Sequence, residues 1–218
     1  MSEPITLDMM RQHLTSAVVC DALDAAGFPH QSPRLQLRPL TVETVLVGRC
    51  KTTLWSNMFH SDPKPYELEL LAVDGCKPDD VLIAAANGSM HSGIWGELLS
   101  TASKTRGAAA CVTDGLVRDI RAIRKMKFPV FAGGIGPLDS KGRGMVAAID
   151  VPVDVAGVHI LPGDLVFGDA DGIVVIPQKI ETKVLTKALE KVLGEHKTLA
   201  DLKRGHKLAD VFARYGVL

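Results

Sequence analysis

Apolar residues along this chain follow helical and strand-like spacings in turn, which predicts a mixed α/β fold. Between positions 15 and 26 they recur on one helical face; Thr15 or Ser16 can cap that helix, and Gly27 ends it. The alternation continues through the middle of the chain. Further helices are expected at 66–73, at 95–106 and from Asp119 onward, and buried strands at 81–85, 108–113 and 128–132.

Glycine positions predict how the strands are joined. A strand pair is expected at 42–47 and 50–54 with Gly48 at the join, and a glycine-rich loop with a charged tip at 133–144. Residues 56–65 are expected to form another loop. The second half of the chain is expected to hold short strands separated by tight turns, at 145–151, 158–160, 165–167 and 173–176.

Residues 178–218 are expected to form a helical arm: one long helix, or two joined near Gly194, and then a short helix after Gly205. The apolar positions of the arm form a stripe that needs a cover, either from its own domain or from a neighbouring subunit. That stripe consists of Ile180, Val184, Leu185, Ala188, Leu189 and Val192. Because no repeat or linker interrupts the chain, residues 1–218 are predicted to form a single α/β domain.

Composition narrows the range of partners. The 25 Lys and Arg residues balance 25 Asp and Glu residues, and 5% of the 218 residues are aromatic. Such a chain is not expected to bind nucleic acid or an anionic membrane surface. Its apolar runs are too short to cross a bilayer, and no signal-peptide pattern follows Met1. The four cysteines form no CxxC pair, so reduced thiols in a cytoplasmic protein are predicted.

Two segments place polar groups where a loop is expected to run into a helix. They are GELL at 96–99 and RD at 118–119. The amides at the start of the first helix, those of Leu98 and Leu99, can hold a carboxylate. Glu97 beside them would repel that anion unless a divalent cation lies between the two.

The second segment, RD at 118–119, also offers groups that can bind an anion and a divalent cation. Arg118 can grip a carboxylate or an enolate oxygen through two N–H groups, which Lys cannot do. Asp119 offers a hard oxygen ligand suited to Mg²⁺ or Mn²⁺. A structural interpretation stays open on the residues alone, since Glu97 can favour the positive end of a helix and Asp119 can be a helix cap.

The remaining polar candidates favour structural roles. His60 and His91 lie in predicted loops, and no histidine pair has the i, i+4 spacing of a helix-borne zinc site. The glycine run at 133–136 lacks the GK[ST] sequence of a phosphate loop, which favours a turn. Three aspartates also have the spacing of turn residues: Asp164, Asp169 and Asp171.

Several motifs spread over most of the chain match one family. They are VCDALD at 19–24, GELL at 96–99, TDG at 113–115 with RD at 118–119, PGDLV at 162–166 and GDADG at 168–172. With these motifs the sequence resembles the RraA-like family, which includes the 4-hydroxy-4-methyl-2-oxoglutarate/4-carboxy-4-hydroxy-2-oxoadipate aldolases. The resemblance implies an α/β/β swivelling-type domain that assembles into ring-like trimers, often paired into hexamers.

In the aldolase branch, the resemblance implies roles for the residues at the two junctions. The aspartate at Asp119 contacts Mg²⁺ or Mn²⁺, and the arginine at Arg118 holds the substrate. The substrate carboxylate binds to the segment that begins at Gly96, through the amides of Leu98 and Leu99.

The resemblance also implies the source of the proton-transfer groups. The acidic residue at Glu97 contacts water on the metal, and a further glutamate comes from the arm of the adjacent subunit. Glu195 is the candidate for it, with Glu190 as the alternative. The implied reaction is metal-dependent retro-aldol cleavage of a 4-hydroxy-2-oxo acid to pyruvate, with oxaloacetate decarboxylation as a related activity.

A function of another class stays open, because the namesake of the family is a non-catalytic regulator that binds ribonuclease E. Such regulators look shorter and lack the arm, which favours the enzyme. No glycine-rich loop follows a first strand, so a methyltransferase is not expected. If the segment 55–66 and the residues His60, Asn87 and His91 line the pocket, the substrate is expected to be another branched or sugar-derived 2-oxo acid.

Overall fold

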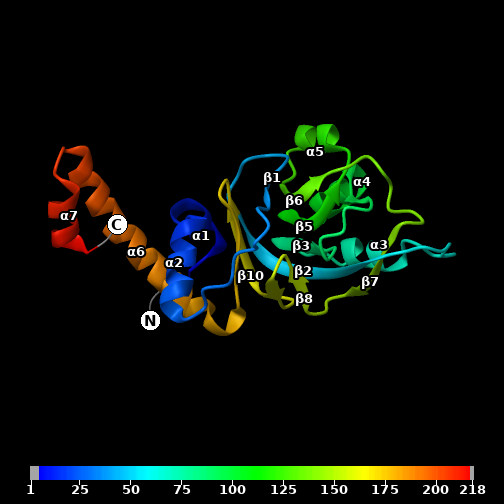
Figure 1. Ribbon diagram of the computed structural model, residues 1–218, viewed down its shortest axis with the longest axis horizontal. Coiled ribbons are helices and arrows are strands. Elements are labelled where there is room, and N and C mark those ends of the chain that lie inside the picture. Colours follow the sequence, from blue (N-terminus) through cyan, green and yellow to red (C-terminus); the bar gives the residue numbers. More distant parts are fainter. Residues whose placement is uncertain (1–4, 217–218) are drawn as a thin grey trace.

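The computed structural model describes residues 5–216; residues 217–218 and residues 1–4, where no signal-peptide pattern was found, lie outside the described part. Within it, nine strands form the main sheet (Figure 1). They are β1 (Arg38–Pro39), β2 (Leu46–Asn57), β3 (Asp80–Ala85), β4 (Gly93–Trp95), β5 (Ala110–Val117), β6 (Val130–Ile135), β7 (Gly144–Ile149), β10 (Leu165–Asp169) and β11 (Gly172–Ile176). The order is β1-β6-β5-β3-β2-β10-β11, with β4 beside β5 and β7 beside β2.

β2 is one continuous strand where two were predicted. Its first half pairs with β10 and its second half with β7, while β3 runs parallel along its other side. Gly48 lies inside the strand, where it pairs with Val166. A Cβ atom at Gly48 would lie 2.3 Å from the carbonyl oxygen of Asp79. The predicted join at Gly48 was therefore wrong, because the glycine serves a close backbone approach and not a turn.

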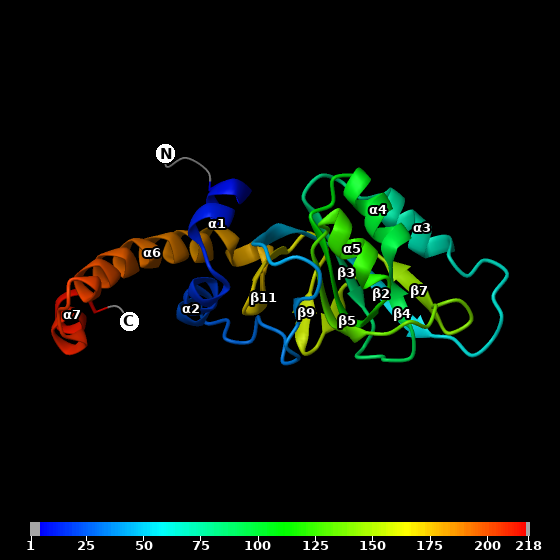
Figure 2. The ribbon, with the colours of Figure 1, turned by 90° about the horizontal axis from the view of Figure 1, so that it is seen from above.

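The two faces of the sheet have different covers (Figure 2). Alternate residues of a strand point to opposite faces. On β3, Leu82 packs in the cluster under the helices, and Ile83 packs in the cluster beside the hairpin. The covering helices are α3 (Glu67–Asp74), α4 (Glu97–Thr105) and α5 (Ile120–Met126), and the hairpin is β8 (Val153–Val155) with β9 (Val158–Ile160). Burial on both faces explains the continuous apolar runs of the central strands.

A third apolar cluster joins the arm to the N-terminal helices. It lies between β10, β11 and the helices α1 (Leu7–His13), α2 (Ser16–Ala26) and α6 (Glu181–Lys203). α2 begins after Thr15, whose hydroxyl accepts from the amide of Val18, and ends at Gly27 with φ of 88°. This confirms the predicted caps.

The arm begins with a 3₁₀ turn, η1 (Gln178–Ile180), and ends with α7 (Leu208–Tyr215). α6 continues through Gly194 without a break, which confirms the first of the two predicted alternatives. Its predicted apolar stripe packs against its own chain up to Val192, which is 7% exposed, whereas Leu193, outside the stripe, is 64% exposed. The chain's own domain therefore covers only part of the arm.

Several predicted boundaries shift where glycines allow strands to approach. β6 runs on to Ile135, so the predicted loop at 133–144 begins as a strand. A Cβ atom at Gly133 would lie 2.7 Å from the carbonyl oxygen of Asp114, which explains the glycine there. Trp95 lies in β4, so the fourth helix begins at Glu97. Pattern analysis missed the elements α1, β1, β4 and β8.

Other expectations are confirmed. The cysteines at positions 20, 50, 76 and 111 are all free, and the last three are buried. No helix within residues 5–216 is long and apolar enough to span a membrane. Asp164 accepts from the amides of Leu161 and Gln178, and Asp169 accepts from Ser16. These aspartates are therefore structural, as their spacing indicated, and the α/β fold with a helical arm is the one predicted.

Candidate functional site

Strand pairing brings the two predicted junctions together. β4 and β5 are parallel neighbours, with Gly93 opposite Leu116 and Trp95 opposite Val117. The amide of Arg118 donates to the carbonyl of Trp95 over 2.8 Å, which extends the pairing to the ends of both strands. Because parallel strands end at the same edge of a sheet, the start of α4 and the Arg-Asp pair before α5 lie side by side.

Asp119 links the two junctions. It has φ of 58°, in the left-handed region that is uncommon for a residue with a side chain. At the start of α5 its side chain caps none of that helix's own amides. Its Oδ2 atom instead accepts from the amide of Glu97 in α4 over 3.1 Å. The predicted helix cap thus exists, but it caps the neighbouring helix.

Gly96 makes room for this arrangement. A Cβ atom there would lie 2.7 Å from Oδ2 of Asp119 and 3.2 Å from Nε of Arg118. The first distance is too short for any side chain. Glycine at position 96 is therefore required if both polar side chains are to lie against the start of α4.

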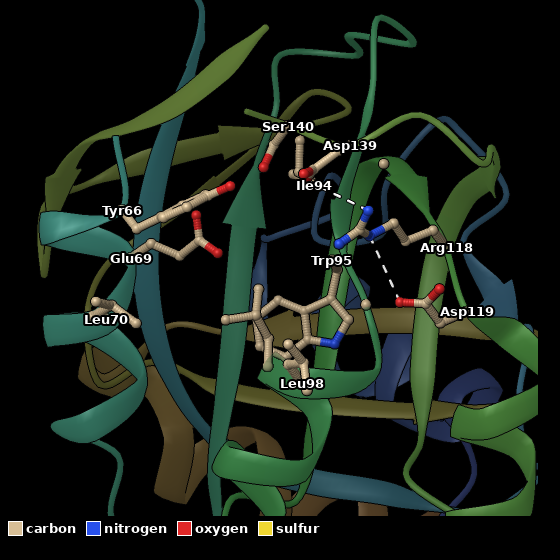
Figure 3. Close-up of a pocket in the computed structure, with 13 residues that line it drawn as sticks. Tyr66, Glu69, Leu70, Ile94, Trp95, Leu98, Arg118, Asp119, Asp139 and Ser140 are labelled. Atoms are coloured by element: carbon tan, nitrogen blue, oxygen red, sulfur yellow. Dashed lines mark ion pairs between the residues drawn. The ribbon is translucent and has the colours of Figure 1, made fainter. Parts of the chain in front are cut away.

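Arg118 is held loosely. Its side chain is 33% exposed, with Nε 3.6 Å from Asp119 and Nη1 3.5 Å from Asp139. Figure 3 shows the guanidinium group between these two carboxylates and facing the cavity. Both distances are longer than those of close charge-assisted hydrogen bonds, so its donors remain available to a ligand.

The start of α4 adds backbone donors. The first intrahelical hydrogen bond runs from the amide of Ser100 to the carbonyl of Gly96. The amides of Leu98 and Leu99 therefore have no partner within the helix. The side chain of Leu98 is 80% exposed, whereas Ser100 and Ser103 are buried. At Leu98 the backbone, and not the side chain, suits a binding role.

A cavity of about 370 Å³ lies in front of these groups. Glu69 of α3 and Tyr66, which directly precedes that helix, reach it from the side opposite Arg118, and Asp139 and Ser140 border it between the two sides (Figure 3). Sequence analysis missed Glu69, Asp139 and Ser140, whereas Tyr66 ends the segment 55–66 that it named as a possible lining of the pocket. A signal for one of them exists, because Glu69 shares a helical face with the buried Ala72 and Val73.

Glu69 is the most unusual group in the cavity wall. The residue is 9% exposed, and its Oε2 atom is buried without a hydrogen-bond partner among the described residues. Burial raises the pKa of Glu69 from its ordinary 4.5 to about 7; the charge of Asp139 adds to this effect and Arg118 opposes it. Burial and the charge of Asp139 also raise the pKa of Tyr66.

Two predicted site residues do not line the cavity. The backbone of Glu97 contributes through its amide, but its side chain is exposed. Glu195 lies on α6, where Lys191 is 3.8 Å away. α6 extends from the opposite side of the molecule to α3 and α4 (Figures 1 and 2), so neither Glu195 nor Glu190 reaches the cavity within one chain.

The histidines also lie elsewhere. His60 lines a separate hollow next to Phe59, and the ring of Phe59 packs against His91 with centroids 5.9 Å apart. Asn87 is exposed and has φ of 53°. None of the three lines the cavity at Arg118, whereas Tyr66, at the end of the segment 55–66, does.

The donor set in the cavity fits one kind of metal ion. Within residues 5–216 no cluster of three His, Cys, Asp or Glu side chains could hold a metal. That excludes a closed zinc site built from described residues of one chain. Mg²⁺ and Mn²⁺ accept one or two carboxylates and take their other ligands from water and substrate. Asp119, 41% exposed beside the cavity, suits that mode.

Comparison with known proteins finds relatives that cover most of this chain. A protein of Halalkalibacterium halodurans named "Putative 4-hydroxy-4-methyl-2-oxoglutarate aldolase" is 36% identical over 187 residues, which cover 85% of this chain and 84% of that protein. An uncharacterized protein from Pseudomonas syringae pv. tomato has a similar structure, with a TM-score of 0.86 at 25% identity over 96% of this chain and 93% of that one.

A third similar protein has another function in its description. Streptomyces coelicolor RraAS2, described as an unusual member of the RNase ES inhibitor RraA protein family, matches with a TM-score of 0.76 and 27% identity over 94% of this chain and all of that one. Residues 16–175 match the family model described as RraA-like: Aldolase/RraA. Since that match spans most of the chain, the protein belongs to the RraA-like family.

Proposed function

We propose that this protein is a divalent-metal-dependent lyase that cleaves a 4-hydroxy-2-oxo acid by a retro-aldol reaction to pyruvate. One observation carries the proposal: a loosely paired arginine, a carboxylate and free helix amides meet at one cavity, through the pairing of β4 with β5. The name of the Halalkalibacterium halodurans relative supports the same reaction class.

Binding of the 2-oxo acid end follows from the donors present. The amides of Leu98 and Leu99 lie at the positive end of α4 and bind the carboxylate. Arg118 donates to the 2-oxo oxygen and stabilises the negative charge that this oxygen gains when the C3–C4 bond breaks. A positioned donor of this kind is worth about 3 kcal/mol of barrier lowering. Trp95, which is 3% exposed, excludes water from one side.

Asp119 is the residue that would hold Mg²⁺ or Mn²⁺, with water and substrate oxygens as the other ligands. When bound, such an ion would draw electron density from the 2-oxo group and ease cleavage of the neighbouring bond. Oxaloacetate decarboxylation leaves the same pyruvate enolate, so the same donors would support it.

Proton transfer needs two steps: the 4-hydroxyl group loses its proton as the C3–C4 bond breaks, and C3 of the enolate gains one. Glu97, whose exposed side chain starts α4 next to Gly96, is one candidate group. The second is Glu195 from another copy of the chain, because the arm of the same chain does not reach the site. The exposed Leu193 and Leu199 beside it suit contact with another copy, in a trimer or hexamer.

Regulation of a ribonuclease is the competing function, and RraAS2 is the observation in its favour. A match over 94% of this chain extends into the arm, so the arm does not separate the two functions. The cavity does separate them, since a protein that acts only through its surface has no need of Gly96, Arg118 and Asp119 in this arrangement.

The test is pyruvate release, coupled to lactate dehydrogenase, from 4-hydroxy-4-methyl-2-oxoglutarate and from oxaloacetate. Activity is expected with Mg²⁺ or Mn²⁺ and not with chelator. Arg118→Ala and Asp119→Ala should each lower kcat/KM by about 10²- to 10³-fold. Arg121→Ala, at an exposed position on α5, is the matched control and should be active.

Folded, metal-loaded protein that releases no pyruvate from either substrate would contradict the proposal for these substrates. Binding to ribonuclease E in a pull-down, unaffected by Arg118→Ala, would favour the regulator.

A further inference from the structure

The cavity has two chemically different halves. One half holds the arginine, the metal-binding carboxylate and the helix amides described above. The other half is bordered by Glu69 on α3, by Tyr66 just before that helix and by Ser140 (Figure 3). In the proposed reaction the first half takes the 2-oxo acid end of the substrate. The second half therefore faces the fragment that carries C4 and leaves after cleavage.

The side chains that line this cavity include more acidic than basic groups. Arg118 is the single cationic side chain among the described residues that line it, whereas Glu69, Asp119 and Asp139 are acidic. Arg118 already lies within 3.6 Å of Asp119 and 3.5 Å of Asp139. A second carboxylate on the leaving fragment would meet Glu69 and Asp139 with no cation of its own, and like charges at close range disfavour binding.

The carboxyl group of Glu69 is also short of partners. The residue is 9% exposed, and its Oε2 atom is buried without a hydrogen bond among the described residues. A buried carboxyl group without partners is costly to ionise, and burial accordingly raises the pKa of Glu69 to about 7. Near neutral pH this carboxyl group both donates and accepts hydrogen bonds.

We propose that Glu69, with Tyr66 and Ser140, selects an uncharged, hydroxyl-bearing leaving fragment, so that the preferred substrate is a 4-hydroxy-2-oxo acid with a single carboxylate. This inference rests on the proposed lyase function. Hydroxyl groups beyond C4 donate to the carboxyl group of Glu69 and accept from the hydroxyls of Tyr66 and Ser140. A 3-deoxy-2-oxo sugar acid has this pattern, whereas 4-hydroxy-4-methyl-2-oxoglutarate has a second carboxylate.

Glu69 acts here as a specificity-determining residue, and its ionisation adjusts the selection. Three groups face it: Asp139 and Arg118 across the cavity and Tyr66 at the residue before its helix. As the pH rises through about 7, Glu69 becomes negative and repulsion of a distal carboxylate increases. Discrimination against dicarboxylates should therefore grow with pH in the natural protein.

The experiment compares pyruvate release from a six-carbon 3-deoxy-2-oxo sugar acid and from 4-hydroxy-4-methyl-2-oxoglutarate, with Mg²⁺, in the natural protein and two variants. The natural protein should show kcat/KM at least about tenfold higher for the sugar acid. Glu69→Gln should lower that ratio at least about fivefold and remove its pH dependence. Glu67→Gln, on the exposed face of the same helix, is the matched control and should leave the ratio unchanged.

Thermal melting of both variants checks that they are folded. Equal or better cleavage of the dicarboxylate, with no change in Glu69→Gln, would overturn the inference and leave the lyase function intact. Release of pyruvate from neither substrate would overturn the lyase function and the inference with it.

Discussion

Two helices each carry a nearly buried carboxyl group, and the two groups have opposite surroundings. Asp201 on α6 is 5% exposed and accepts hydrogen bonds from Arg204, Arg214 and Tyr215 over 2.8–3.1 Å. The hydrogen bond from Tyr215 and the charge of Arg214 lower the pKa of Asp201. Glu69 on α3 is 9% exposed, its Oε2 atom lacks a partner among the described residues, and burial raises its pKa to about 7.

This difference distinguishes polar groups that hold the fold together from polar groups that are available to bind a ligand. Short, complete hydrogen bonds at Asp201 hold α7 against α6. The same contrast holds for two arginines: Arg49 makes a two-pronged pair with Glu181, with the second bond at 2.8 Å, whereas Arg118 approaches its carboxylates only to 3.5 and 3.6 Å. Polar groups left incompletely paired at a cavity are the ones that a ligand can satisfy.

The largest effect on activity is expected from a Cβ atom at position 96, because it would occupy space next to the side chains of Asp119 and Arg118. Gly96→Ala places a Cβ atom 2.7 Å from Oδ2 of Asp119, so either the carboxylate or the start of α4 must move. Because the change would displace the amides at the start of α4 or the carboxylate of Asp119, we expect kcat/KM for pyruvate release to fall about 10²- to 10³-fold. Gly144→Ala is the control, because its Cβ atom would have only ordinary contacts, the nearest at 3.5 Å. Similar activities of the two variants would remove Gly96 from the site.

The second-largest effect is expected in the free energy of unfolding, which should depend on pH because of Glu69. Because the pKa of Glu69 is raised from 4.5 to about 7, the folded chain keeps a proton that the unfolded chain loses. Its contribution to the free energy of unfolding therefore falls as the pH rises through this range, by roughly 3 kcal/mol in total. Urea denaturation should show that Glu69→Gln gains stability relative to the natural protein as the pH rises.

Glu67→Gln serves as the control for that series, since its side chain is 57% exposed. A constant difference between Glu69→Gln and the natural protein across the range would mean that Glu69 is ionised throughout.

A smaller and local effect is expected at the arm. Asp201→Asn removes the charge that faces Arg204 and Arg214, so the amides of α7 should exchange with deuterium faster. The pKa of Asp201 is lowered from 3.8, so its stabilising contribution is complete above that value and is lost only as the pH falls through the lowered pKa. Protection of α7 should therefore be constant near neutral pH. Unchanged exchange in the variant would show that α7 is held by its apolar contacts alone.

The smallest effect is expected at Leu98, where the backbone and not the side chain is proposed to bind. Its side chain is 80% exposed, so Leu98→Ala should change stability by less than about 0.5 kcal/mol. Because the amide is retained, kcat/KM should change less than about threefold. A tenfold loss would instead assign the contact with substrate to the side chain.

Local patterns in the sequence were sufficient for much of this molecule. The helix at α2 with both caps, the strand at β3, the long helix of the arm and the two polar junctions all follow from spacing within a single segment. Each depends on the next few residues, through periodic burial or a cap, so a linear reading detects it. The family motifs at the two junctions, GELL at 96–99 and RD at 118–119, are also short runs of adjacent residues, so they too can be recognised in the sequence alone.

Only the tertiary structure decided which of these groups meet. Pairing of β4 with β5 puts Asp119 against the amide of Glu97, and packing of α3 turns Glu69 toward Arg118. The same packing leaves Glu195 at the far side of the chain. Strand pairing and helix packing join residues far apart in sequence, and neither leaves a periodic mark within one segment. For that reason the sequence alone determined the chemistry of the junctions, and the fold determined the cavity that they share with Glu69.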